Sequence, residues 1–148
     1  MTGKRPPSVE IDSYDLDAQV GFRLRLAMQR HAAIFFAHMI PNLTQTQFAV
    51  LVRLWEQGST SQNELGRLAA IDSATIWGVV QRLQTGGLVE TEADPKDRRR
   101  LTVSLTGHGR ATVETAIERA RASSEETLAP LSAAEQTTLN RLLRKLSQ

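Results

Sequence analysis

Four positively charged side chains, Lys96 and Arg98 to Arg100, fall within five consecutive positions, and Asp94 and Asp97 stand beside them. Clustered cations of this kind are suited to binding phosphate groups. An arginine at the tip of a hairpin can enter the minor groove of duplex DNA, and a neighbouring aspartate can hold its guanidinium in a bidentate pair. We choose Arg99, oriented by Asp97, for this role. The predicted contact set of the loop is Lys96, Asp97, Arg98, Arg99 and Arg100. An ordinary solvated turn is the alternative.

A second candidate surface lies within residues 73–82. Ile76, Val79, Val80 and Leu83 recur at helical spacing and predict a buried face. The opposite face carries short or hydrogen-bonding residues, which a recognition helix needs in order to enter the major groove and reach phosphates or base edges. A solvated helix face is the alternative, and core packing is an equal alternative for Trp77. The predicted DNA contacts here and in the preceding helix are Ser73, Ala74, Thr75, Trp77, Gln81 and Arg82, with Ser61, Gln62 and Asn63.

The composition excludes several other kinds of site. The sequence has 0 cysteines, so disulfides, thiolate zinc sites and thiol redox sensing are ruled out. His31 and His38 are separated by two helical turns, which is too far for one tight chelate, and we expect no metal. A nucleophile motif, a phosphate-binding glycine loop and a dense carboxylate–histidine cluster are all missing, so we expect no enzyme and no cofactor.

Hydropathy and charge indicate the cellular compartment in which we expect the chain. The net charge is only +2, so the local cluster matters more than the total. No stretch reaches the roughly 20 apolar residues of a membrane span, and the first ten residues lack the apolar centre of a secretory signal. We expect a cytoplasmic protein without a membrane partner.

The elements that must position these residues follow from periodicity and capping. The low apolar content of residues 1–14 predicts a disordered tail. The spacing of apolar residues predicts a helix from Asp15 to Met39. Three S/T-x-x-E/Q capping boxes, at residues 44–47, 61–64 and 132–135, predict helix starts. Asp72 can cap a fourth helix that ends at Gly86 and Gly87. A further long helix is predicted from Thr106 to about Ala129.

Strands complete the central part of the chain. Residues 88–91 and 101–105 read as strands, with the charged loop between them. Helices followed by such a hairpin define a mainly α fold with a small β-hairpin wing, a winged helix-turn-helix. We assign residues 44–105 to DNA binding. Residues 15–43 and 106–148 carry more apolar surface than one small core needs, and we predict that they form a helical dimerisation region in a homodimer.

Several segments together resemble the MarR family of transcriptional regulators. The match covers almost the whole chain from Asp15, and its most specific element is the D-P-K-D-R-R-R wing after a G-L-V strand. The resemblance implies an all-helical dimer with winged hairpins on a pseudo-palindromic operator of double-stranded DNA, with recognition helices about one turn apart. It also implies that Arg99 is the minor-groove arginine and Asp97 its orienting acid. The matching segments are L-T-Q-T-Q-F-A-V-L from Leu43, S-Q-N-E-L-G-R-L-A from Ser61, D-S-A-T-I-W-G-V-V-Q-R-L from Asp72 and S-L-T-G-H-G from Ser104.

The first helix is similar to that of a MarR subgroup that responds to hydroxycinnamoyl-coenzyme A thioesters. An aromatic acyl thioester needs an apolar slot for its ring and cations for its phosphates. Phe35, Phe36 and Met39 are candidates for the slot. The predicted ligand set is Arg23, Arg25, Arg30, His31, Phe35, His38 and Met39. In the alternative interpretation, the aromatics form dimer core, the histidines are satisfied polar groups and the arginines are solvated.

These features predict a repressor of aromatic catabolic genes that an aromatic acyl-coenzyme A thioester releases from DNA. A free aromatic acid or another lipophilic compound is the alternative effector. A winged-helix module for protein contacts is the third interpretation. Release requires that the effector prefer a state of the dimer that mismatches the operator.

Overall fold

The computed structural model describes residues 13–148. Most of the predicted tail, residues 1–12, lies outside this range, and Ser13 and Tyr14 are exposed and irregular. The elements are a 3-10 turn η1 (Leu16–Ala18), the helices α1 (Val20–His38), α2 (Gln45–Gln57), α3 (Gln62–Leu68), α4 (Ser73–Thr85), α5 (Gly107–Leu128) and α6 (Ala133–Leu146), and the strands β1 (Thr60–Ser61), β2 (Val89–Ala93) and β3 (Leu101–Leu105).

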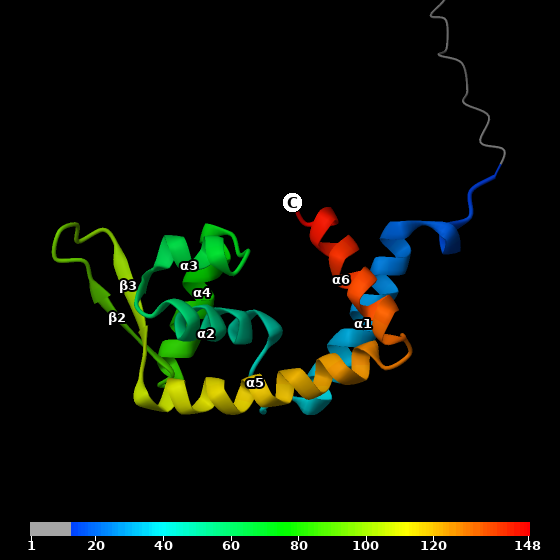
Figure 1. Ribbon diagram of the computed structural model, residues 1–148. Helices are drawn as coiled ribbons and strands as arrows, with labels where there is room; N and C mark the ends of the chain where they lie inside the picture. Colours follow the sequence, from blue (N-terminus) through cyan, green and yellow to red (C-terminus); the bar gives the residue numbers. More distant parts are fainter. Residues whose placement is uncertain (1–12) are drawn as a thin grey trace, which may run out of the picture.

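Helix α5 is the axis of the molecule. Figure 1 shows α2, α3, α4 and the β2–β3 hairpin grouped over one end of α5, while α1 and α6 lie at the other end. The hairpin projects away from the body, so its connecting loop forms a wing. The mainly α winged helix-turn-helix predicted from the sequence is therefore confirmed.

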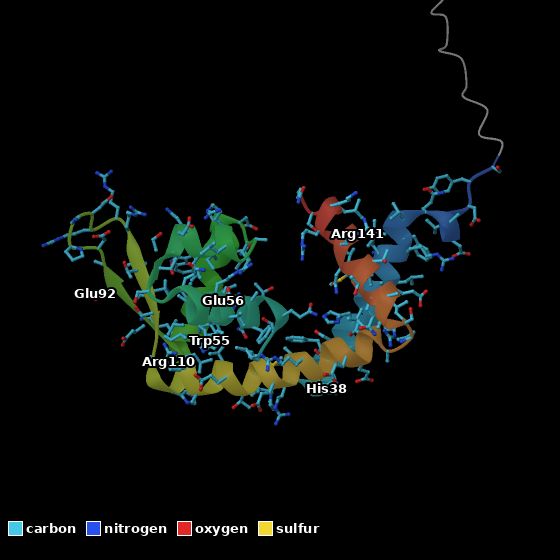
Figure 2. The ribbon with its side chains drawn as sticks, in the orientation of Figure 1. His38, Trp55, Glu56, Glu92, Arg110 and Arg141 are labelled. Atoms are coloured by element: carbon cyan, nitrogen blue, oxygen red, sulfur yellow. The ribbon has the colours of Figure 1, made fainter. Side chains whose placement is uncertain are left out.

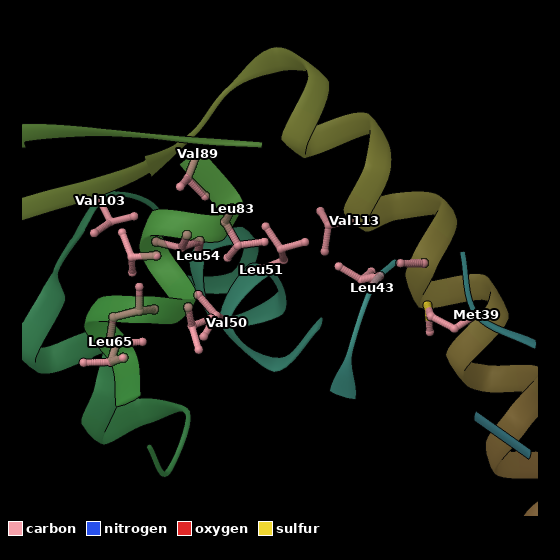
Figure 3. Packing of buried hydrophobic residues seen from close by; sticks show 14 of the residues in the cluster. Met39, Leu43, Val50, Leu51, Leu54, Leu65, Leu83, Val89, Val103 and Val113 are labelled. Atoms are coloured by element: carbon pink, nitrogen blue, oxygen red, sulfur yellow. The ribbon is translucent and has the colours of Figure 1, made fainter. Parts of the chain in front are cut away.

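One hydrophobic core holds the winged-helix part together. It joins α2, α3 and α4 to the sheet and to the first half of α5 through fully buried side chains such as Leu51, Leu54, Leu65 and Val103 (Figure 3). All four apolar residues of α4 assigned inward are between 0% and 3% exposed. Because this face is sealed, the opposite face of α4 is fixed toward solvent.

The turn between α3 and α4 is tight. A Cβ added at Gly66 would lie 3.0 Å from the Ile71 carbonyl oxygen and 3.3 Å from Ile76 Cγ2. Ala70 takes the left-handed conformation at φ 56°, and the Ile71 N–H donates to the Gly66 carbonyl at 2.8 Å. A residue without a side chain at position 66 lets the two helices meet at this turn.

The sheet has three antiparallel strands in the order β1-β3-β2. Strand β2 pairs with β3 from Val89 opposite Leu105 to Ala93 opposite Leu101, and the short β1 adds Thr60 opposite Val103. Strand β1 was not predicted, because two residues are too few to give an alternating pattern. Val103 is the one buried residue of β3, whereas Leu101 and Leu105 are half-buried. Of the alternate apolar residues of this strand, Val103 alone is therefore fully inside the core.

The helix starts agree with the capping patterns in two of three places. Reciprocal capping boxes stand at Thr44 with Gln47 and at Ser132 with Glu135. Ser61 accepts the Glu64 backbone N–H, but the Glu64 carboxylate binds Arg67 instead of returning to the cap. The expectation of a reciprocal box at residues 61–64 is therefore wrong in its second half, because a cation one turn later competes for that carboxylate. The first helix also starts later than predicted, at Val20, because residues 16–18 form a separate turn.

Candidate nucleic-acid interface

The exposed face of α4 carries the residues predicted for DNA. Ser73, Ala74, Thr75, Trp77 and Arg82 are exposed and Gln81 is half-buried. Trp77 is 57% exposed, so its ring is not packed in the core of this chain. The helix therefore offers a short polar first turn followed by an aromatic ring, an amide and a guanidinium.

Asp72 fixes the first turn of α4. Its carboxylate accepts the Thr75 backbone N–H and the Thr75 hydroxyl, both at 2.8 Å. The bond from the Thr75 backbone and then the bond from its hydroxyl hold the pKa of the Asp72 carboxyl below its ordinary value. An N-cap bound in this way stabilises the helix end that the sequence predicts to enter a groove.

The start of α3, the ring of Trp77 and the base of the wing enclose a small pocket of about 210 Å³. Arg100 Nη2 donates to Ser61 Oγ at 3.5 Å, which links the wing to α3. Ser61 Oγ also accepts the Glu64 N–H, so its own hydroxyl hydrogen remains available to an acceptor. The pocket is lined by Ser61, Gln62, Asn63, Trp77, Arg99, Arg100 and Leu101. Its cations and donors match the groups that bind a DNA phosphate.

The wing itself is ordered by aspartates acting on the backbone. The Asp97 carboxylate accepts the Arg99 backbone N–H at 3.0 Å, and the Asp97 carbonyl accepts the Arg100 N–H at 2.9 Å. The ion pairs within residues 13–148 do not include the predicted pair between Asp97 and the Arg99 guanidinium. That detail is corrected: an acceptor two residues before an N–H closes an Asx turn locally, so Asp97 shapes the loop. Lys96, Arg98, Arg99 and Arg100 all remain exposed.

The structure does not bring the predicted ligand residues of α1 into one cavity. Phe35 and Met39 are each 6% exposed and belong to the core, whereas Phe36 is 82% exposed. Arg23 and Arg25 are exposed, with no side-chain hydrogen bond to another residue between 13 and 148. Phe35 and Phe36 do line a common pocket of about 530 Å³ with residues 42–46, but that pocket includes no other member of the predicted ligand set. Packing of α1 against α5 holds Met39 in the core and keeps it out of that pocket.

Three further members of that set tie α1 to the end of α5. Arg30 donates to the carbonyls of Thr127 at 2.7 Å and Glu126 at 3.1 Å. His31 Nδ1 lies 2.8 Å from Thr127 Oγ1, and since that hydroxyl donates to the Ser123 carbonyl, Nδ1 is the donor to it. His38 Nε2 contacts the Glu126 carboxylate. These contacts correspond to the alternative in which the histidines are satisfied polar groups.

A different pocket, which the sequence did not reveal, lies between α2 and α5. It has a volume of about 730 Å³ and apolar walls that include Phe48, Val52, Ile117 and Ala120. Trp55, which is 41% exposed, Arg53 and Arg121 also line it. Figure 2 shows Trp55 and Glu56 over the first half of α5, well separated from His38. No local signal could have revealed it, because side chains two positions apart, such as Arg53 and Trp55, do not share a helical face and the second wall comes from α5.

Arg53 connects this pocket to the helix-turn-helix. Its Nε donates to the Leu68 carbonyl at 2.9 Å, and its Nη1 donates to the Glu56 carboxylate at 2.8 Å. Leu68 is the last residue of α3, four positions before the Asp72 cap of α4. One guanidinium thus touches both the pocket wall and the end of the helix that precedes the recognition helix.

A reading helix, a supporting helix before it and an arginine-bearing hairpin after it define a winged helix-turn-helix protein of the DNA-binding class. Comparison with known proteins agrees. The family model described as MarR family matches residues 43–101. The repressor NicR of Pseudomonas putida is 43% identical over 144 residues, which span 95% of this chain and 91% of NicR. The chain belongs to the MarR family of transcriptional regulators.

Two solved structures of similar chains bear on what the fold binds. BpsR of Bordetella bronchiseptica, whose DNA binding is regulated by 6-hydroxynicotinic acid, has 42% sequence identity and a TM-score of 0.87, over 92% of this chain and 98% of BpsR. A MarR mutant from Escherichia coli complexed with operator DNA has 26% identity and a TM-score of 0.79, over 86% of this chain and 92% of that one.

Residues 13–148 offer neither a membrane span nor a metal site. None of the helices in this range has the length and apolarity needed to cross a membrane. In the same range no three carboxylate or histidine side chains lie close enough together to hold a metal ion.

Proposed function

We propose that this chain is a ligand-responsive repressor that binds a pseudo-palindromic operator as a homodimer and releases it when a small aromatic carboxylic acid binds. The observation that carries the proposal is the geometry of α4: its apolar face is sealed in the core, and its opposite face presents short and hydrogen-bonding residues beside an arginine-bearing wing. Residues 44–105 supply the reading head. The predicted DNA contacts keep their assigned roles, with Arg99 in the minor groove, except that Asp97 shapes the wing loop through the Arg99 backbone N–H.

Exposed apolar side chains at both chain ends support the homodimer. Val20 and Met28 of α1 are 66% and 54% exposed, and Leu146 of α6 is 68% exposed. Helix α6 has no buried residue at all, although its spacing is amphipathic. A second copy of the chain, packed against residues 15–43 and 106–148, would remove these surfaces from water.

The pocket between α2 and α5 is the proposed effector site. Its apolar walls suit an aromatic ring, Trp55 offers a stacking surface, and Arg53 and Arg121 offer cations to a carboxylate. The similarity to BpsR supports an aromatic acid such as 6-hydroxynicotinic acid as the effector class.

Arg53 gives this site a route to the DNA-binding helices. A carboxylate that binds the Arg53 guanidinium competes with the Leu68 carbonyl, which that guanidinium now holds at 2.9 Å. Losing that contact frees the end of α3 and the turn that leads to α4. An effector therefore favours a position of the recognition helix that fits the operator less well.

A coenzyme A thioester is the second candidate effector. Arg23 and Arg25 favour it, because both are exposed and neither side chain bonds another residue between 13 and 148. Cations in that situation are suited to the phosphates of coenzyme A.

The test is a mobility shift on the DNA adjoining the gene, with 6-hydroxynicotinic acid, a free hydroxycinnamic acid and its coenzyme A thioester added separately. We expect a retarded duplex that a free aromatic acid releases. Release by the thioester alone would replace the proposed effector class with the second candidate. A chain that retards no duplex, specific or random, would refute the DNA-binding function itself.

A further inference from the structure

Trp77 is the one large apolar side chain on the exposed face of α4. This residue is 57% exposed, and in the free protein its contact with water is unfavourable. We propose that this indole reads thymine, by packing against the C5 methyl group in the major groove. The inference rests on the proposed DNA-binding function and adds to it a base identity at one position of each half-site.

The core does not need this ring. Ile76 and Val80, beside it on the helix, are each 0% exposed, so the apolar face is complete without Trp77. The aromatic contacts within residues 13–148 join His31, Phe35 and Phe48 and do not include it. The ring instead lines the small pocket between the start of α3 and the base of the wing. Its position is therefore set by the surface that faces DNA.

The neighbours of the ring are groups of a different chemistry. Asn63, Arg99 and Arg100 around the same pocket are amide and guanidinium donors, which suit phosphates and the polar edges of bases. The indole adds an apolar surface, which phosphates and polar base edges do not bind. Among the groups that bases present in the major groove, the apolar one is the methyl of thymine.

Small residues let the ring approach. Ala74 is exposed and Gly78, one turn later on the same side of α4, is half-buried, so little side chain separates the helix backbone from the groove. A Cβ added at Gly78 would lie 3.4 Å from Arg82 Nη2, which shows that the Arg82 guanidinium folds back along the helix over this position. The stripe of small residues is thus bordered by Trp77 on one side and by Arg82 on the other.

The experiment removes single methyl groups from DNA. A duplex bound by the full chain is first selected from random sequence, and each thymine is then replaced in turn by deoxyuridine, which lacks only the methyl. At one position of each half-site, related by the symmetry of the operator, replacing thymine should weaken binding by the wild-type chain about fourfold. This factor corresponds to the free energy of burying one methyl group. Trp77→Ala should bind the thymine and deoxyuridine duplexes equally at that position, whereas Trp77→Phe should keep part of the difference.

Fluorescence supplies a second readout. The chain has two tryptophans, so the emission of Trp77 is obtained as the difference between the wild-type chain and Trp77→Phe, both measured without effector. The Trp77 emission should change on binding the thymine duplex and change less on the deoxyuridine duplex. If no deoxyuridine substitution weakens binding, or if Trp77→Ala shows the same loss as wild type, the inference is overturned while DNA binding stands. If selection enriches no duplex, the proposed function fails first.

Discussion

Asp72 shows how a single cap can make the reading helix sensitive to acid. The pKa of its carboxyl is lowered in the folded state by hydrogen bonds from Thr75, first from the backbone N–H and then from the hydroxyl. A carboxyl with a lowered folded pKa stabilises the fold fully above its unfolded pKa, and this contribution is lost as pH falls through the folded value. The first turn of α4 should therefore loosen in the acid range.

We predict that Asp72→Asn removes this part of the acid dependence while keeping an acceptor for the Thr75 N–H. Asp72→Ala should lower the melting temperature at neutral pH as well, because the helix loses its cap. Thermal unfolding as a function of pH measures both effects. Glu114→Gln is the control, since Glu114 is exposed on α5 and its side chain has no hydrogen bond within residues 13–148. If the melting temperature of Asp72→Asn falls at acid pH as it does in the wild-type chain, Asp72 is not the source of the acid dependence.

At the scale of elements, Arg53 joins α2 to the end of α3 and to the proposed effector pocket. We predict that Arg53→Gln, which loses the Leu68 contact, lowers operator affinity toward that of the acid-bound wild-type chain and loses most of the effect of 6-hydroxynicotinic acid. Coupling between sites is typically about 5-fold to 150-fold in affinity, and the variant should bring that ratio close to one. Operator affinity measured by fluorescence anisotropy with and without the acid gives the ratio.

Arg141→Gln on α6 is the matched control, because it removes a guanidinium far from the pocket (Figure 2). Wild-type coupling in Arg53→Gln would exclude Arg53 as the link. Acid-free operator affinity equal to that of the wild-type chain would show that the Leu68 contact does not set the position of the recognition helix.

The join between α5 and the sheet depends on Gly109. A Cβ at this position would lie 1.9 Å from the Leu88 carbonyl oxygen, which already accepts the Thr106 N–H at 3.1 Å. We predict that Gly109→Ala destabilises the fold by about 1–3 kcal/mol, because the first turn of α5 must move away from β2. Urea unfolding measures the change. Gly107→Ala, which meets no atom within 4 Å, should be close to neutral, and equal effects of the two substitutions would refute the clash.

The same scale shows what could be predicted from the sequence. Helices α2, α4 and α6 follow from caps and apolar spacing, since both signals are local and each cap bonds within its own first turn. The pairing of Arg30, His31 and His38 with the end of α5 could not be read, because the partners are 88 to 97 residues away. For the same reason, the sequence could not show that packing separates most of the predicted ligand residues of α1. The pocket beside Trp55 needs two helices to define it.

For the whole molecule, the exposed apolar surface of α6 implies a partner. We predict that the double variant Leu142→Glu, Leu146→Glu is a folded monomer, because those side chains are 44% and 68% exposed and are not part of the core formed by residues 13–148. Its operator affinity should fall by about a hundredfold or more, since the two half-sites are then bound independently. Sedimentation equilibrium measures the mass.

Asn140→Glu places the same charge on the opposite side of α6 and should leave the association unchanged. A double variant that keeps the mass of the wild-type chain would show that α6 does not form the interface. A wild-type chain that is itself monomeric would remove the homodimer from the proposed function.

The length of α5 has a mechanical consequence. Its 22 residues form a rod of roughly 33 Å that carries the hairpin at one end and the terminal helices at the other. Tilting such a lever by about 5° displaces its far tip by about 3 Å, close to the roughly 3.4 Å step between successive nucleotides of a strand. A tilt of a few degrees is thus enough to put a reading head out of phase with its target.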